Sequence, residues 1–140
     1  MLTNLLMLFV LLAGRDQPAN EAEAIYMLCE LSGGECVYEE ETRCTSYVPL
    51  YGGINCDGDC SITAYSEPVD YTRTIACSEE MPYGTDVFIE GFGFRGACLD
   101  TGGAITTGRI DVAMLPEDRG SFIHATLPVV WVIDTGDNNY

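Results

Sequence analysis

Short apolar segments separated by glycine-containing turns fill the sequence from Cys60 onward, and they constrain the fold more than any other feature. Each is about five or six residues long, the usual length of a β-strand. Short strands in so small a region leave many open edges unless the sheet closes. We therefore predict an all-β fold, a small six-stranded barrel. Its expected strands are Ser61–Ser66, Thr72–Cys77, Asp86–Glu90, Phe94–Leu99, Arg109–Met114 and Pro128–Ile133.

The region before the strands has a different character. Alanine and glutamate favour a short helix over Glu21–Leu31. Residues 25–54 are rich in cysteine, glycine and acidic residues and show no clear hydrophobic period, so we predict an irregular arm held by disulfides that use Cys29, Cys36 and Cys44. The barrel then occupies residues 55–134, and residues 135–140 form a polar tail.

An almost wholly apolar run, Leu2–Gly14, stands near the start of the chain. It is shorter than the roughly 20 residues that span a membrane, and it suits the apolar part of a signal peptide. Ala22-Glu23-Ala24 offers a small-x-small cleavage site, so residues 1–24 are predicted to be a signal peptide. No basic residue precedes the run, and Arg15 follows it, which leaves a retained hydrophobic anchor or assembly segment as the alternative.

Seven cysteines in 140 residues are typical of an exported protein, and they predict a secreted, extracellular or cell-envelope location. Their odd number leaves one thiol either unpaired or linked to another chain. Cys56 and Cys60 have ligand-like spacing, but no second cysteine pair follows and the single histidine, His124, is far away in the sequence. A closed zinc site needs four converging ligands, so no metal site is predicted.

The chain is strongly acidic, with 22 acidic residues against six basic ones and a net charge of −16. This charge argues against nucleic acid and against anionic membrane surfaces, because both attract cationic proteins. The simplest interpretation is a solvated acidic surface that keeps an exported protein soluble. Cation binding and adaptation to high salt are the alternatives.

Two aspartates stand out among the predicted strands. Asp100 ends an apolar strand and is followed closely by Gly102-Gly103, a pair that permits a sharp turn and close approach of a ligand. Asp111 lies between two β-branched residues, so strand alternation sends it to the face opposite theirs. Asp100 as a turn former and Asp111 as the ion-pair partner of Arg109 are the structural alternatives. Otherwise, the short connection lets both carboxylates line one groove.

Four motifs in fixed order carry a resemblance to a known family. They are Thr63-Ala64-Tyr65, then Pro82-Tyr83-Gly84-Thr85, then Asp100-Thr101-Gly102-Gly103-Ala104-Ile105, then Arg109-Ile110-Asp111. This pattern resembles the 3D domain, named for three aspartates and found in MltA-type lytic transglycosylases and related bacterial cell-wall proteins. The resemblance covers about residues 55–133 and implies a double-psi β-barrel with a glycan groove across it.

The resemblance also implies a reaction and its residues. Asp111 would be the general acid/base for non-hydrolytic cleavage of the β-1,4 bonds of peptidoglycan, with Asp100 assisting it or orienting the sugar. One carboxyl with a raised pKa suits both proton transfers, and no cofactor is required. The residues expected to contact the glycan are Tyr65, Thr101, Gly102, Gly103 and Arg109. Packing within a strand is the alternative role for Tyr65.

The first of the three aspartates is missing. Cys77 or Ser78 stands at its place, Glu79 or Glu80 is a possible substitute, and we expect Cys77 to pair with Cys98. Two hypotheses therefore remain: a glycan-cleaving enzyme, or a non-catalytic glycan-binding or structural subunit of an extracellular filament or virion. In the second, the apolar N-terminal segment and the odd cysteine would contact neighbouring copies.

Overall fold

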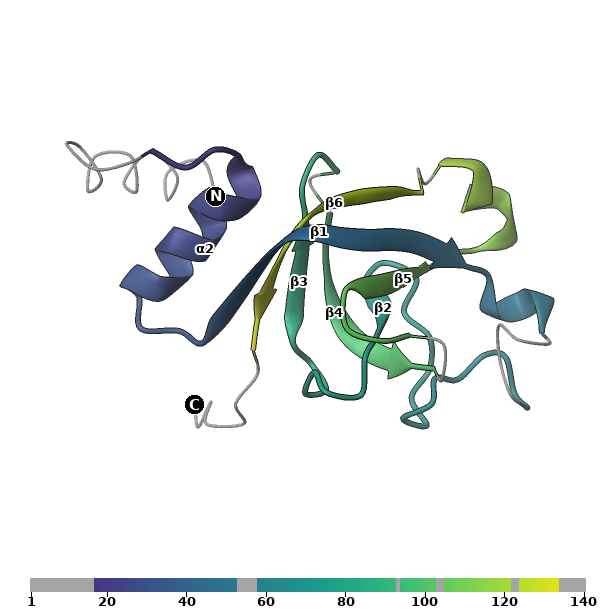
Figure 1. The fold of residues 1–140 in the computed structure, drawn as a ribbon. Coiled ribbons are helices and arrows are strands. Elements are labelled where there is room, and N and C mark those ends of the chain that lie inside the picture. The colour runs from purple at the N-terminus through teal and green to yellow at the C-terminus, as the bar shows by residue number, and fades with distance from the viewer. Residues whose placement is uncertain (1–16, 53–57, 93, 103–104, 122–123, 134–140) are drawn as a thin grey trace.

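A computed structural model describes residues 17–52, 58–92, 94–102, 105–121 and 124–133. Helix α2 precedes six strands, and short 3-10 helices connect some of them (Figure 1). The predicted apolar run Leu2–Gly14 and the tail 135–140 lie outside the described residues. The elements are α2 (Glu21–Leu31), β1 (Cys36–Tyr47), η1 (Pro49–Tyr51), β2 (Thr74–Cys77), β3 (Asp86–Ile89), β4 (Phe94–Thr101), β5 (Arg109–Ala113), η3 (Pro116–Ser121) and β6 (Ala125–Val132).

The six strands form one sheet that closes into a ring in the order β1-β5-β2-β4-β3-β6. Two neighbouring pairs are parallel, β1 with β5 and β2 with β4, and the other four pairs are antiparallel. Closure leaves no strand of the ring with a free edge. The prediction of a mostly-β fold with a closed six-stranded sheet is therefore confirmed.

The inside of the ring is filled by apolar side chains from every strand. Trp131 is the largest of them and is 2% exposed. β-Branched residues dominate around it, as expected for a small interior that must be filled at high density. The buried members of this core are Cys44, Ile75, Cys77, Val87, Ile89, Cys98, Ile110, Val112, Val129 and Trp131.

The prediction of an irregular arm over residues 25–54 is wrong for much of its length, because residues 36–47 form β1, a strand of the ring. Its pairing with β6 shifts register between Glu39 and Thr42, which marks a β-bulge. The bulge interrupts the alternation, and the acidic run Glu39-Glu40-Glu41 hides the strand from a hydrophobicity pattern. Beyond the bulge, Thr42 and Cys44 are both fully buried.

Ser61–Ser66 was expected to be a strand, and this prediction is also wrong. The segment contains one isolated bridge, Ile62 to Pro68, and the chain folds back on itself there. Thr63 N–H donates to the carbonyl of Glu67 at 2.7 Å, and Ser66 takes a positive φ of 63°. A hydrogen-bonded reversal of this kind leaves too few extended residues to pair as a strand.

Helix α2 packs on the outside of the ring against β1 and β6 (Figure 1). The side chain of Asn20 caps it by accepting from Glu23 N–H at 2.7 Å. Ala22 is fully buried in a cluster with Phe88 and Val130, and its small side chain permits close approach. Ala22 N–H also donates to Glu90 Oε2 at 2.6 Å.

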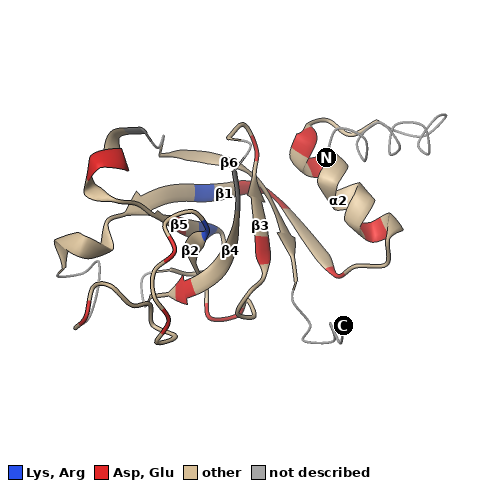
Figure 2. Cartoon of the chain, turned by 180° about the vertical axis from the view of Figure 1, so that it is seen from behind, with Lys and Arg blue, Asp and Glu red and all other residues tan. Residues whose placement is uncertain are grey.

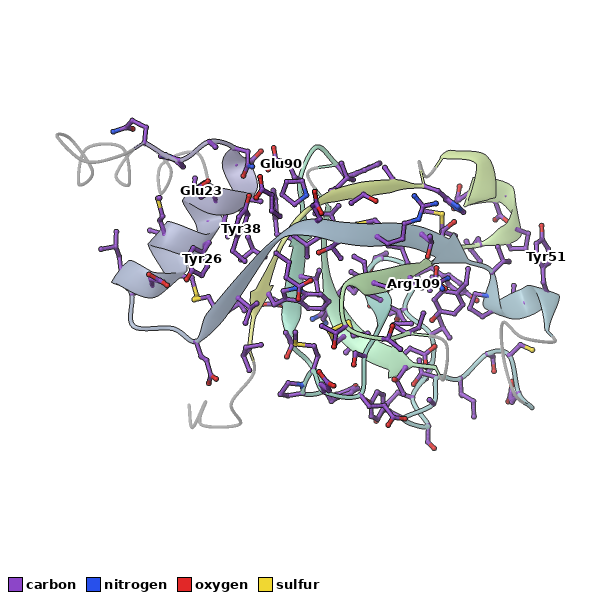
Figure 3. The ribbon with its side chains drawn as sticks, viewed as in Figure 1. Glu23, Tyr26, Tyr38, Tyr51, Glu90 and Arg109 are labelled. Atoms are coloured by element: carbon purple, nitrogen blue, oxygen red, sulfur yellow. A yellow bond between two sulfur atoms is a disulfide. The ribbon has the colours of Figure 1, made fainter. Side chains whose placement is uncertain are left out.

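Aromatic contacts complete the attachment of α2. The rings of Tyr26 and Tyr38 lie 5.9 Å apart, and Asn20 Nδ2 donates to the Tyr38 hydroxyl at 3.1 Å. Figure 3 shows Glu23, Tyr26, Tyr38 and Glu90 gathered between the helix and the sheet. Among the described residues, no helix is long and apolar enough to cross a membrane.

Two disulfides join described cysteines. Cys29–Cys36 connects α2 to β1, and Cys77–Cys98 connects β2 to β4 as predicted. Cys44, expected to take part in a disulfide, is instead free and fully buried in the core. Burial raises the pKa of its thiol to about 11. A link from Cys44 to another chain would therefore require the sheet to open.

Candidate functional site: two carboxylates on one face of the sheet

The two predicted aspartates lie in one lateral row of the closed sheet. On β5, Asp111 pairs with Ala76 of β2, and Ala76 pairs on its other side with Asp100 of β4. Thr45 of β1 pairs with Asp111 and completes what we call the acid row: Thr45, Asp111, Ala76 and Asp100. Because laterally paired residues project from the same face, both carboxylates lie outside the core, with Cα atoms roughly 10 Å apart across two strand spacings.

Asp111 is half-buried, and burial raises the pKa of its carboxyl above the usual range. A hydrogen bond from the Thr45 hydroxyl to Oδ1, 2.7 Å long, opposes this shift. The charges of Arg109 and His124 oppose it more weakly. Desolvation has the larger effect on the pKa, because the partly apolar surroundings destabilise the ionised carboxyl more than these partners stabilise it.

Asp100 is held by three donors. The Tyr47 hydroxyl donates to Oδ2 at 2.6 Å, and the N–H groups of Ala64 and Thr101 donate to Oδ1 at 2.8 and 2.9 Å. Ala64 belongs to the turn that replaces the expected strand Ser61–Ser66, so this turn positions Asp100. The two acids therefore have different surroundings: several donors fix Asp100, whereas burial dominates at Asp111.

Tyr47, which the sequence did not single out, links the two environments. Its phenol reaches from β1 to Asp100, and burial together with the bond to Asp100 raises the pKa of its hydroxyl. The charges of Asp111 and Tyr71 contribute to the same shift, so all of these groups are close neighbours. Ala76, between the two acids, is only 4% exposed. The surface between the carboxylates is thus already covered.

A cleft opens beside the acid row, where β2 and β4 end and β5 begins. It has a volume of about 430 Å³. Its walls are Ser78, Glu79, Glu80, Gly102 and Ile105–Thr107, and we call it the mouth cleft. The predicted substitutes for the missing aspartate, Glu79 and Glu80, therefore line a cavity, and the hydroxyl of Thr107 donates to Glu80 Oε2 at 3.0 Å.

The other predicted contact residues have varied positions. Thr101 supports the local structure, since its hydroxyl donates to the Cys77 carbonyl at 2.8 Å. Gly102 lines the mouth cleft, and Gly103 lies outside the described residues. Tyr65 is 38% exposed and packs edge to face with Tyr83, with ring centres 5.0 Å apart.

Arg109, the expected ion-pair partner of Asp111, influences that carboxyl through its charge. Within the described part of the chain, its Nε has no hydrogen-bond partner and is buried. Figure 3 shows Arg109 by β5, on the part of the sheet away from α2. Figure 2 shows acidic positions on α2, on the strands and on the loops, and fewer basic ones.

Metal ligands are the remaining possibility for such an acidic protein. No group of three or more histidine, cysteine, aspartate or glutamate side chains among the described residues is arranged to hold a metal ion. His124 instead lies 2.9 Å from the Ser46 hydroxyl.

Comparison with known proteins finds similar structures but no similar sequence. No family model matches the chain, and no curated protein sequence matches it. The crystal structure of MltA from Escherichia coli is similar over 56% of this chain and 29% of its own, with 21% identity and a TM-score of 0.44. An alanine variant of the E. coli lytic transglycosylase MltA in an apo form gives 22% identity, 53% and 27% coverage and a TM-score of 0.42. The chain thus spans less than a third of the length of these two structures.

Proposed function

We propose that this chain is a secreted domain that acts on a glycan, with peptidoglycan as its substrate. The four motifs that resemble the 3D domain suggest the substrate class. The two parallel pairs within the closed sheet, β1 with β5 and β2 with β4, support the double-psi β-barrel that this resemblance implies. The described disulfides suit the oxidising environment of an exported or envelope protein.

The observation that carries the proposal is the raised pKa of Asp111 on the same face of the sheet as Asp100. A general acid must hold its proton near the working pH, and burial is the ordinary way to achieve this with a carboxyl. Thr45 orients the Asp111 side chain by its hydrogen bond. These two features support Asp111 as the proposed proton donor.

The proposed reaction needs one such group. Asp111 donates its proton to the oxygen of the β-1,4 bond as the bond between that oxygen and C1 of the muramyl sugar breaks. The Asp111 carboxylate then takes the proton of the 6-hydroxyl of the same sugar, and the 6-oxygen bonds to C1 to give an anhydro ring. Asp111 ends protonated, as it began, and no water is consumed.

Asp100 would assist by orienting the sugar, because its three donors hold the side chain in one position. For a sugar to lie between the two acids, the Tyr47 phenol must move away from Asp100. On the flank, the exposed Tyr65–Tyr83 pair offers aromatic surface for a sugar ring, next to the Ala64 N–H that holds Asp100. Thr101, Gly102, Gly103 and Arg109 complete the proposed contact set.

Digestion of purified peptidoglycan tests the enzyme proposal. The wild-type protein should release anhydromuropeptides, detected by mass spectrometry, and Asp111→Asn should lower the rate at least 100-fold because the proton donor is lost. Asp59→Asn is the matched control, since Asp59 is exposed and, among the described residues, its side chain bonds Ser61 of its own turn. No anhydro product from the wild type would remove the catalytic claim for this substrate.

The covered surface between the acids favours a second candidate, a domain that binds glycan without cleaving it. Ala76 is 4% exposed and Tyr47 is bonded to Asp100, so the acids do not face an open groove in this conformation. Such a domain would be a structural or adhesive subunit of an extracellular or virion assembly. Retention on peptidoglycan sacculi without any anhydro product would support it, and absence of retention would contradict both candidates.

A further inference from the structure

The first turn of α2 holds the helix to the ring through hydrogen bonds. The side chain of Asn20 accepts from Glu23 N–H at 2.7 Å and donates to the Tyr38 hydroxyl of β1 at 3.1 Å. Ala22 N–H donates to Oε2 of Glu90, directly after β3, at 2.6 Å. Figure 3 shows Glu23, Tyr38 and Glu90 together between the helix and the sheet. The turn is thus bonded to two parts of the ring that lie far apart in the sequence.

Both alanines of this turn are withdrawn from solvent. Ala22 is fully buried against Phe88 of β3 and Val130 of β6, and Ala24 is 2% exposed. Apolar side chains buried in this way contribute to stability roughly in proportion to the area that they remove from water. Residues 20–24 are therefore a structural part of the domain rather than a linker that precedes it.

The same residues contain the predicted cleavage motif, Ala22-Glu23-Ala24. Cleavage after Ala24 would remove the cap and uncover the apolar cluster beneath Ala22, and it would leave residues 25–31 as the rest of the helix. Isolated helices shorter than about 12 residues are marginal in water, so this remnant would depend on its disulfide to β1, Cys29–Cys36. A domain processed at this bond would also lose the hydrogen bond to Glu90.

Upstream of α2 the sequence offers no second motif of this kind. Between Ala13 and Glu21, no two alanine, glycine or serine residues stand two positions apart. A signal peptidase recognises small residues in that spacing. The first such motif after the apolar run therefore coincides with a buried helical turn. This coincidence favours the retained N-terminal segment that the sequence left as the alternative to a signal peptide.

We propose that the bond between Ala24 and Ile25 stays intact in the exported protein, so that the mature domain begins at or before Asn20 and contains the whole of α2. Once α2 has formed, the bond is protected, because proteolysis prefers exposed and poorly ordered segments. The inference rests on the secreted location that is part of the proposed function. It does not depend on whether the acid row cleaves a glycan.

The mass of the exported protein tests this proposal. The full chain is expressed in a bacterial host with an export pathway, and the protein recovered outside the cytoplasm is weighed intact by mass spectrometry. The mass should correspond to a first residue at or before Asn20. A chain that begins at Ile25 would overturn the proposal. Protein found only in the cytoplasm would instead contradict the secreted location on which the inference rests.

Two substitutions in the full chain give independent readouts. Ala24→Leu destroys the small-x-small motif and should leave the first residue of the exported protein unchanged. Ala19→Leu makes the same change at an exposed alanine before the helix and is the control. A changed first residue in Ala24→Leu alone would overturn the proposal.

Asn20→Ala removes the cap and the bond to Tyr38, and it should lower the melting temperature of the exported protein by about 4 °C. An exported protein that has lost residue 20 would melt at the same temperature with either residue encoded there. Identical melting of the wild type and Asn20→Ala would therefore count against a mature domain that contains the first turn of α2.

Discussion

The side of the closed sheet that α2 covers differs from the side that carries the acid row in how its polar groups are paired. Where α2 packs, small alanines allow close contact, and Asn20, Ala22 and Tyr38 all take part in hydrogen bonds with described partners. On the other side, burial raises the pKa of Asp111, and the Tyr71 hydroxyl is buried without a partner among the described residues. The polar groups under α2 are therefore paired, whereas the side that carries the acid row keeps a desolvated carboxyl and an unpaired buried hydroxyl, both of which lower stability.

The largest expected loss in the free energy of unfolding comes from removing a disulfide, and the two disulfides can be compared in this way. Cys77–Cys98 closes a sequence separation of 21 beside the acid row, and Cys29–Cys36 closes a separation of seven beside α2. Chain-entropy arguments give a loss of about 3 kcal/mol for the Cys77→Ala and Cys98→Ala double variant, and about 2 kcal/mol for Cys29→Ala with Cys36→Ala. Urea unfolding measures both. A larger loss on the helix side would show that native-state contacts outweigh loop closure.

The next largest loss of stability comes from removing one tyrosine hydroxyl, either Tyr47 beside the acid row or Tyr38 under α2. Tyr47→Phe removes a bond to the Asp100 carboxylate and should lower the free energy of unfolding by about 2 kcal/mol, because hydrogen bonds to charged groups are the stronger kind. Tyr38→Phe removes a bond between neutral groups and should cost about 1 kcal/mol. Thermal unfolding of the two variants gives the comparison directly. Equal losses would mean that Tyr47 is released from Asp100 in solution.

The smallest expected effect is the change of stability with pH that Asp111 causes. The folded state keeps a proton on Asp111 at pH values where the unfolded chain, with a pKa of about 3.9, has lost it. Raising the pH from about 4 through the folded-state pKa should therefore lower the stability of the wild type relative to Asp111→Asn, and the difference should then level off.

Asp59 should change stability with pH in the opposite direction to Asp111. Hydrogen bonds from Ser61 lower the pKa of its carboxyl, so its stabilising contribution exists above the unfolded pKa and is lost as the pH falls. Asp59→Asn should consequently match the wild type in acid and be the less stable protein near neutral pH. Calorimetry across the pH series measures both trends, and a wild type that gains stability relative to Asp111→Asn as the pH rises would refute the buried acid.

The sequence predicts those parts of the molecule that follow a local pattern. The segments that became β2 to β6 alternate or form short apolar runs between turns, and the Cys77–Cys98 pair was expected from the family resemblance. β1 was missed because its bulge and its acidic run remove the period that identifies a strand. Tyr47 was missed for the same reason, since its place beside the acids follows only from the pairing of β1 with β5.

The unpaired core thiol has a use of its own. Cys44 pairs laterally with Ile110, one residue from Asp111, and it is sealed inside the ring. A thiol-specific reagent can reach it only when β1 separates from a neighbouring strand, so the labelling rate counts such openings under native conditions. The labelling rate of Cys44 thus reports how often β1 and β5, the strand pair that carries the proposed acid, separate. A bound glycan that stabilises this pair would lower the labelling rate.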